Sequence, residues 1–311
     1  MSDIKTKRVF NYRYDEHSSR LVSDFVGNTP FVQLSDKIYA KLESVNPGGS
    51  IKDRPVKWII DDAEKNNLLK PNDTIIEATS GNTGIALAMI GAERGYNVKI
   101  VMPCDMSEER KILLKMFGAD LIEVGEGDFE QAINLKDEIV DQEGYFSLNQ
   151  FNNPLNIECH YKTTFKELLN HSLTIGKYIS AFVSGTGTGG TIMGVQKGFS
   201  EFDTRVKMIA VEPAESPVMS GGEKGLHGIQ GIGDGSQFLV DLDKIDDILT
   251  ISTEDAKKRC KELALDNGLL VGISAGANIL AAEQWVEKNK PSGIVFTILC
   301  DRGERYSSML Y

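Results

Sequence analysis

Residues 178–213 read YISAFVSGTGTGGTIMGVQKGFSEFDTRVKMIAVEP, and this stretch decides the fold class. The apolar runs at 178–184 and 205–213 predict two strands, and the pattern over 188–202 predicts a helix between them. Two strands joined through a helix pair in parallel, and a parallel sheet has both of its faces covered. The stretch therefore predicts an α/β protein.

The same alternation of strand-like and helix-like runs extends over most of the chain. Further strands are expected over 38–43, 74–79, 97–103 and 293–301, and further helices over 53–69, 82–95, 107–118, 253–268 and 277–290. This order predicts two three-layer αβα domains with mostly parallel sheets. A chain of 311 residues is long enough for two such domains.

The domain boundary is expected near the polar stretch QFNNPLN at 150–156. The first domain would span 1–155 and the second 156–311, with the segment 1–45 crossing to the second domain. Ligand sites of such folds lie in the loops at the carboxyl ends of the strands. The glycine-rich segment 221–235 is expected to be a long loop of the second domain, and long ordered loops are usually functional.

Composition excludes several classes of protein. Lys and Arg number 34 and Asp and Glu 45, so the net charge is −11, and an acidic chain is a poor nucleic-acid binder. The four cysteines lie far apart, which indicates reduced thiols rather than a zinc site. No apolar run is long enough to span a membrane, and the N-terminus lacks the apolar core of a signal peptide. We expect a cytoplasmic protein that binds neither nucleic acid nor membranes.

The turn between the first predicted strand and its helix is a glycine loop. Gly185, Gly187 and Gly190 satisfy the pattern G-x-G-x-x-G, which is found in dinucleotide-binding proteins. Free amides at a helix N-terminus bind any phosphate, however, and Thr188 and Thr191 add hydroxyl groups to the same loop. The loop predicts a phosphate site and leaves open which molecule carries the phosphate.

The segment NPGGSIKDR at 46–54 carries Lys52 directly before an expected helix, with Asp53 available as its N-cap. The partial positive charge of a helix N-terminus disfavours an ammonium, so the amine form of Lys52 is easier to reach. Imine chemistry requires that amine form. A solvated loop lysine is nevertheless the commoner case, so Lys52 alone does not decide the chemistry.

Two further strand-to-helix turns carry polar groups. The motif ATSGNTG offers Thr79, Ser80, Asn82 and Thr83 beside free backbone amides, which suits a carboxylate. One of these side chains would suffice for an ordinary N-cap, so four favour a binding role. The motif VGISAGA places Ser274 at a similar turn, where an ordinary N-cap is the simpler explanation on its own.

Taken together, these motifs resemble the cysteine synthase (O-acetylserine sulfhydrylase) family, within the second fold type of pyridoxal-phosphate enzymes. The resemblance is carried by N-P-G-G-S-I-K-D-R, T-S-G-N-T-G, Q-F-N-N-P, G-T-G-T-G-G-T, H-G-I-Q-G-I-G, G-I-S-A-G-A and G-E-R-Y, in the family order from Gly27 to Tyr306. It implies pyridoxal 5′-phosphate instead of NAD in the glycine loop, in the cleft between the two domains.

The resemblance also implies roles for individual residues. Lys52 would be the Schiff-base lysine and the acid and base at Cα, Asn82 would bind the 3′ oxygen of the cofactor, and Ser274 would face its pyridine nitrogen. The cofactor phosphate would be held by Gly187, Thr188, Gly189, Gly190 and Thr191. The substrate would be bound through its α-carboxylate by Thr79, Ser80, Thr83 and Gln150, and on its amine side by the loop around Gly231.

The activity that the resemblance implies is a β-replacement on an amino acid. O-acetylserine and sulfide would give cysteine and acetate through an aminoacrylate intermediate. Family likeness further implies a homodimer, and it allows serine acetyltransferase as a protein partner. The N-terminal segment 1–20 has no clear counterpart in the family.

Asp234 departs from the family pattern, which usually has alanine at this place in G-I-G-A-G. A carboxylate at the mouth of the site would repel hydrosulfide, by about 1 kcal/mol at close range. It would also orient water or attract the ammonium of a second amino acid, which makes Asp234 a candidate catalytic residue. The alternative activity therefore starts from cysteine, releases hydrogen sulfide and forms serine or lanthionine. An ordinary turn aspartate beside glycines is the simpler explanation.

Two other classes of protein stay open at this stage. A catalytically idle member of the family could act as a binding partner for another protein, although Lys52, Asn82 and Ser274 are all present. An NAD-dependent dehydrogenase would rest on the glycine loop alone. A colourless purified protein would favour the first of these, and nicotinamide binding would favour the second.

Overall fold

The computed structural model describes residues 21–79, 81–127, 129–233 and 238–310. Its strands are β1 (Phe31–Gln33), β2 (Ile38–Leu42), β3 (Thr74–Ala78), β4 (Asn97–Pro103), β5 (Asp120–Val124), β6 (Ile179–Gly185), β7 (Lys207–Pro213), β8 (Asp247–Ile251) and β9 (Ile294–Leu299). Its α-helices are α1 (Asp53–Lys65), α2 (Asn82–Arg94), α3 (Glu108–Met116), α4 (Phe129–Glu143), α5 (Leu155–Lys162), α6 (Thr164–Ile175), α7 (Gly190–Phe202), α8 (Thr253–Asn267), α9 (Ile273–Asn289) and α10 (Ser307–Leu310). Short 3₁₀ turns lie at Val22–Phe25, Glu43–Val45, Leu242–Lys244 and Gly303–Tyr306.

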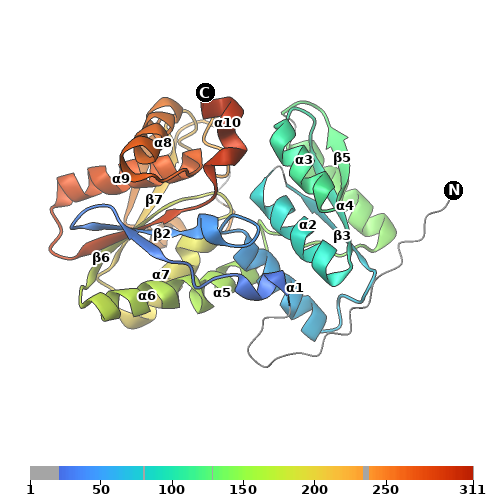
Figure 1. Cartoon of the computed structure of the whole chain (residues 1–311), viewed down its shortest axis with the longest axis horizontal. Coiled ribbons are helices and arrows are strands. Elements are labelled where there is room, and N and C mark those ends of the chain that lie inside the picture. The colour runs from blue at the N-terminus through green and yellow to red at the C-terminus, as the bar shows by residue number, and fades with distance from the viewer. Residues whose placement is uncertain (1–20, 80, 128, 234–237, 311) are drawn as a thin grey trace.

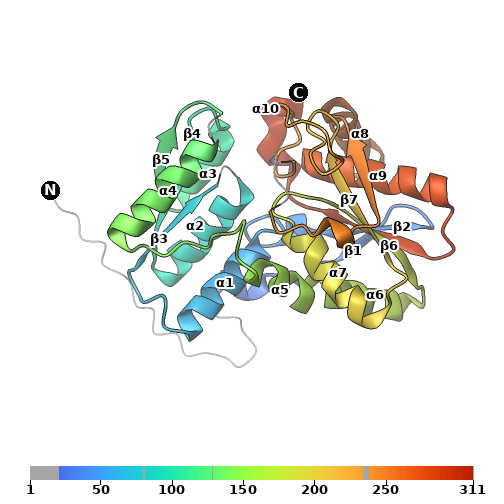
Figure 2. The ribbon, with the colours of Figure 1, turned by 180° about the vertical axis from the view of Figure 1, so that it is seen from behind.

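These strands form two sheets, and the α/β fold with mostly parallel sheets is confirmed. The larger sheet has the order β1-β2-β9-β6-β7-β8 and the smaller one β3-β4-β5. Only β1 and β2 pair antiparallel among the named strands. Figure 1 shows the two sheets side by side, each with its own helices, and Figure 2 shows the same division from behind.

The chain enters the larger sheet before it builds the smaller one. Strand β2 pairs in parallel with β9, so a segment near the N-terminus lies beside the last strand of the chain. We propose a domain boundary near residue 155. Of the segment 1–45, which was expected to cross to the second domain, β1 and β2 lie in the larger sheet, whereas the backbone N of Ser23 donates to Glu93 of α2. The N-terminal segment 1–20 lies outside the described residues.

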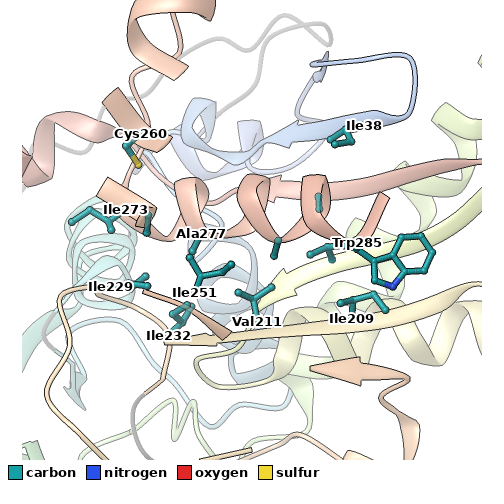
Figure 3. Packing of buried hydrophobic residues seen from close by; sticks show 14 of the residues in the cluster. Ile38, Ile209, Val211, Ile229, Ile232, Ile251, Cys260, Ile273, Ala277 and Trp285 are labelled. Carbon is teal, nitrogen blue, oxygen red and sulfur yellow. The ribbon is translucent and has the colours of Figure 1, made fainter. Parts of the chain in front are cut away.

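Both faces of the larger sheet are buried, as a parallel sheet requires. Neighbouring residues of one strand belong to opposite cores: Val211 packs with α8 and α9, and Ala210 packs on the side of α6 and α7. Figure 3 shows the first of these cores, where Ile209 and Val211 lie close to Trp285 and Ala277 of α9. Because β2, β9, β6, β7 and β8 pair in parallel, their carboxyl ends lie at one edge of the sheet, and the loops that follow them start there.

Two expected helix starts differ from the structure. Helix α9 begins at Ile273 rather than at 277. Its N-cap residue is Gly272, and Ser274 lies in its first turn. Helix α1 begins at Asp53, and its N-cap residue is Lys52. The side chain of Asp53 instead accepts a hydrogen bond from the backbone N of Gly48 at 2.5 Å. Over the described part of the chain, no helix has both the length and the apolar character needed to cross a membrane.

Candidate functional site

A cavity of about 590 Å³ lies where loops of both sheets meet. Its lining comes from the carboxyl ends of β3, β6 and β9 and from the first turns of α2, α7 and α9, where ligand sites of open α/β sheets are found. The structure brings most of the sequence-predicted residues together there: Lys52, Thr79, Asn82, Thr83, Gln150, Gly187, Thr188, Gly189, Thr191, Gly231 and Ser274. Gly190 lies behind this lining, as the first residue of α7. Ser80 and Asp234 fall outside the described residues.

Lys52 lies directly before helix α1, between two fixed neighbours. The backbone N of Ile51 donates to the carbonyl of Cys300 at 2.9 Å, which ties this turn to the end of β9. On the other side, Asp53 is fully buried, and burial raises its pKa to about 7. Lys52 thus lies in the cavity lining at the N-terminus of helix α1.

The turn after β3 places the hydroxyl groups of Thr79 and Thr83 at the start of helix α2. Thr79 and Thr83 are both buried, and the hydroxyl of Thr83 donates to Oε1 of Gln150 at 2.7 Å. Gln150 belongs to a separate segment that follows α4, 67 residues away in the chain. In this arrangement Thr83 orients Gln150, and the hydroxyl of Thr79, the side-chain amide of Gln150 and the N-terminus of α2 lie where they can bind a carboxylate.

Asn82 is held by residues from the far end of the chain. Its Nδ2 donates to Oδ2 of Asp301 at 2.7 Å, and its Oδ1 accepts from Nη1 of Arg305. Tyr306 also donates to Asp301, which is fully buried, and this burial raises the pKa of Asp301. The motif G-E-R-Y at 303–306 signalled this region in the sequence, but its contact with Asn82 could not be seen there.

Two glycines of the phosphate loop pack closely against neighbouring segments of the chain. Gly189 has φ +87°, and a Cβ there would lie 2.6 Å from Val240. A Cβ on Gly190 would lie 2.0 Å from Oδ1 of Asn156, so a side chain at either position would distort the loop. The loop thus lies at the N-terminus of the 13-residue helix α7, where the helix dipole and the hydroxyl groups of Thr188 and Thr191 favour an anion. This donor set fits a phosphate group, the part of pyridoxal phosphate that such a loop binds.

Asn156 and His160 support this loop, and sequence reasoning missed both. Nδ2 of Asn156 donates to Oγ1 of Thr188 at 3.0 Å and to the carbonyl of Gln150 at 3.1 Å. Nε2 of His160 lies 3.3 Å from Oγ1 of Thr191. Burial keeps the pKa of His160 well below its usual range, so the ring is neutral. In the sequence, Asn156 stands in the polar stretch expected to be the domain boundary, and nothing local points to its contact with Thr188.

Ser274 lies at the N-terminus of α9 next to the thiol of Cys300. Burial raises the pKa of Cys300 to about 12, so the thiol is neutral near pH 7. Asn278, one turn further along α9, accepts from the backbone N of Gly185 at 2.6 Å. Through these contacts α9 fixes the hydroxyl of Ser274, the thiol of Cys300 and the end of β6 relative to one another.

Comparisons with known proteins agree with this site. Residues 22–301 match the family described as pyridoxal-phosphate dependent enzyme. The chain is 41% identical over 298 residues to a cysteine synthase from Staphylococcus aureus, covering 92% of this chain and 95% of that protein.

Two solved structures extend the comparison. An O-ureido-L-serine synthase superposes with a TM-score of 0.89 at 38% identity, covering 94% of this chain and 95% of that one. A hydrogen sulfide-producing enzyme from Fusobacterium nucleatum superposes with a TM-score of 0.87 at 39% identity, covering 93% and 100%. The resemblance seen in the sequence is confirmed, and pyridoxal phosphate is the cofactor. This chain belongs to the family of pyridoxal-phosphate dependent enzymes.

Proposed function

We propose that this protein is a cysteine synthase, which converts O-acetylserine and sulfide into cysteine and acetate. One observation carries the proposal: a single cavity is lined by Lys52, by residues of the turn after β3 and by residues of the glycine loop, namely Thr79, Asn82, Thr83, Gly187, Thr188, Gly189 and Thr191. An amine, a carboxylate site and a phosphate site in one cavity are what amino-acid chemistry on pyridoxal phosphate needs. The 41% identity to a cysteine synthase supports the choice of reaction.

The residues present fit the cofactor at three places. Gly187, Thr188, Gly189, Gly190 and Thr191 would hold its phosphate. Asn82 would donate to its 3′ oxygen through the second hydrogen of Nδ2, the first being bonded to Asp301. Ser274 would face the ring nitrogen. The cofactor supplies an electron sink for the pair of electrons left at Cα of the substrate.

Lys52 would move the proton in this reaction. Its amine takes the proton from Cα, the β-substituent leaves, and the same group returns the proton after a nucleophile has added at Cβ. Thr79, Thr83 and Gln150 would meanwhile hold the substrate α-carboxylate, with Ser80 as a fourth expected ligand. The loop at Gly231 would lie on the amine side. Binding of the carboxylate would orient Cα toward Lys52 and would exclude water from the reacting atoms.

A second activity deserves a direct test because one solved relative is described as a hydrogen sulfide-producing enzyme. In that reaction cysteine is the first substrate, hydrogen sulfide leaves, and water or a second cysteine adds to give serine or lanthionine. We propose Asp234 as the residue that would orient water or an ammonium for this addition. Its placement lies outside the described residues, so the case for Asp234 rests on the sequence alone.

One assay grid separates the two activities. O-acetylserine or cysteine is offered as first substrate, and sulfide, water or a second cysteine as nucleophile, with kcat/KM measured for every pair. A cysteine synthase gives its highest kcat/KM with O-acetylserine and sulfide. A highest value with cysteine would replace the first proposal by the second, and no turnover with either substrate would contradict both.

Assembly and location are further parts of the proposal. We infer a homodimer, with serine acetyltransferase as a candidate protein partner, in the cytoplasm. Sedimentation of the purified protein tests the dimer, and co-sedimentation with serine acetyltransferase tests the partner. A monomer at micromolar concentration would contradict the first inference.

A further inference from the structure

Glu77 is a buried carboxylate with no part in the reaction described above. It lies in β3, two residues before Thr79, and its side chain is 1% exposed. One oxygen, Oε2, accepts from the hydroxyl of Ser147 at 3.0 Å and from the backbone N of Asn149 at 3.0 Å. The backbone N of Gln150 donates to the same carboxylate. Three donors from one four-residue turn thus converge on Glu77.

This turn needs such support because its backbone is unusual. Asn149 has φ +48°, in the left-handed region that non-glycine residues seldom adopt. The turn follows Phe146, which is hydrogen-bonded on both sides to β3, and it ends at Gln150. Gln150 then reaches Oγ1 of Thr83 with its side chain and Asn156 with its carbonyl. The carboxylate of Glu77 therefore determines where Gln150 lies relative to the substrate loop.

The charge on Glu77 is costly for the fold. Burial raises its pKa to about 6, although Lys136 of α4 and the donors of the turn favour the ionised form. Among the described residues, Lys136 is the charged group facing Glu77, and Lys136 is itself paired with Asp137. Since folding raises the pKa of Glu77 from 4.5 to about 6, the free energy of unfolding falls as the pH rises between these two values, and the loss is complete above pH 6. Stability alone would favour a neutral side chain at this position.

We propose that Glu77 is a positioning residue, which acts through Gln150 to hold the binding site for the substrate α-carboxylate. The inference rests on the proposed function, because it takes Gln150 as a carboxylate ligand. An ionised Glu77 accepts all three donors of the turn. A protonated Glu77 is a weaker acceptor, and it carries a hydrogen that has to find another partner. Carboxylate binding should accordingly weaken as the pH falls through about 6.

The test compares Glu77→Gln with Glu123→Gln. Glu123 lies in β5 of the same sheet, is paired with Lys111 and does not contact the turn, so it receives the same change of charge elsewhere. Binding of L-serine, an amino acid with a poor leaving group, is followed by the change in cofactor absorbance. We expect Glu77→Gln to raise the Kd for serine and the KM of the reacting amino acid about tenfold, the effect of a hydrogen bond to a charged group. Its kcat and cofactor content should stay within about twofold, and Glu123→Gln should resemble the wild type.

Two more readouts separate positioning from a general loss of structure. The Kd of the wild type should rise below pH 6, and that rise should be absent in Glu77→Gln. Glu77→Gln should unfold at pH 8 at a temperature no lower than the wild type. Ser147→Ala removes one donor and should raise KM by a smaller factor, which keeps the test valid if Glu77→Gln fails to fold.

Unchanged serine binding in both Glu77→Gln and Ser147→Ala would overturn the inference, as would an equal loss of kcat and cofactor content. Failure of the proposed function has a different signature. The protein would then bind serine with the pH dependence described, yet turn over neither O-acetylserine nor cysteine.

Discussion

Asn82 illustrates how a residue of the site depends on side chains far away in the chain. Nδ2 of Asn82 donates to Asp301, and its Oδ1 accepts from Arg305. These two hydrogen bonds determine the orientation of the side-chain amide. Asp301 in turn is buried and accepts from Tyr306. The hydrogen that Asn82 can offer to a cofactor therefore points in a direction set by the end of the chain.

Asp301→Asn should weaken cofactor binding. The neutral amide can present a donor to Asn82, and the loss of a hydrogen bond to a charged group corresponds to about tenfold or more in Kd. Titration of the apoenzyme with pyridoxal phosphate measures this directly. Asp203→Asn is the control, because Asp203 pairs with Arg205 at the surface and should leave the Kd unchanged. Equal Kd values for both variants would show that Asp301 does not orient Asn82.

Lys52→Ala should remove nearly all turnover while the protein stays folded. Lys52 lies in the lining of the cavity, so its removal deletes an amine from the site without opening a gap in either core. Turnover is measured with O-acetylserine and sulfide, and folding by circular dichroism. Full activity in this variant would contradict the whole assignment of the site.

Helix α7 links the glycine loop to the core of the larger sheet. The helix begins at Gly190, which packs against Asn156. One turn later, Gly194 packs against His160, and a Cβ on Gly194 would lie 2.5 Å from the side chain of His160. Glycines at these positions let α5 and α7 approach closely, and this approach brings Asn156 to Thr188. Packing of the two helices thus shapes the phosphate site.

Gly190→Ala should displace the first turn of α7, since the new methyl group would lie 2.0 Å from Asn156 Oδ1. We expect the Kd for pyridoxal phosphate to rise by about tenfold or more, because the loop amides no longer converge on the phosphate. Ser200→Ala, on the same helix but exposed, is the matched control. A Kd for Gly190→Ala within twofold of the control would mean that the phosphate binds elsewhere.

A buried ionic cluster joins the two parts of the molecule. Glu43 and Arg54, from the start of the chain, meet Lys41 and Glu167 at 2.5–3.8 Å, and the first three are fully or almost fully buried. Arg54 holds the pKa of Glu43 below its usual range despite burial. Helix α1, which carries Lys52 at its N-terminus, is anchored by this cluster to α6 of the larger part.

Glu43→Gln should lower the free energy of unfolding by about 3 kcal/mol, because it leaves buried cations without their carboxylate. The depressed pKa of Glu43 means that its contribution is present above the usual carboxyl pKa and is lost as the pH falls through the folded value. Urea unfolding of both proteins at pH 7 and at pH 4 measures this: the difference between them should shrink at the lower pH. Glu201→Gln, an exposed partner of Tyr161, is the control. A constant difference across this range would show that the charge of Glu43 does not contribute.

The sequence by itself determined the α/β class and several of the residues that line the cavity. Periodicity reports which face of a strand or helix is buried, and the turn residues of Gly187–Thr191 and Thr79–Thr83 are local signals with a local physical cause. These features depend on neighbours in the chain, so they can be read without coordinates. The family resemblance supplied the roles of Lys52 and Ser274, which composition and spacing had left open.

Only the tertiary structure decided how those residues are supported. Glu77, Asn156 and Asp301 are buried polar groups whose partners lie in other segments, and their types and spacing carry no signal for such contacts. A buried polar group is stable only where a partner meets it, and that partner is chosen by the packing of helices and strands. The start of α9 at Ile273 was likewise decided by packing rather than by the local pattern.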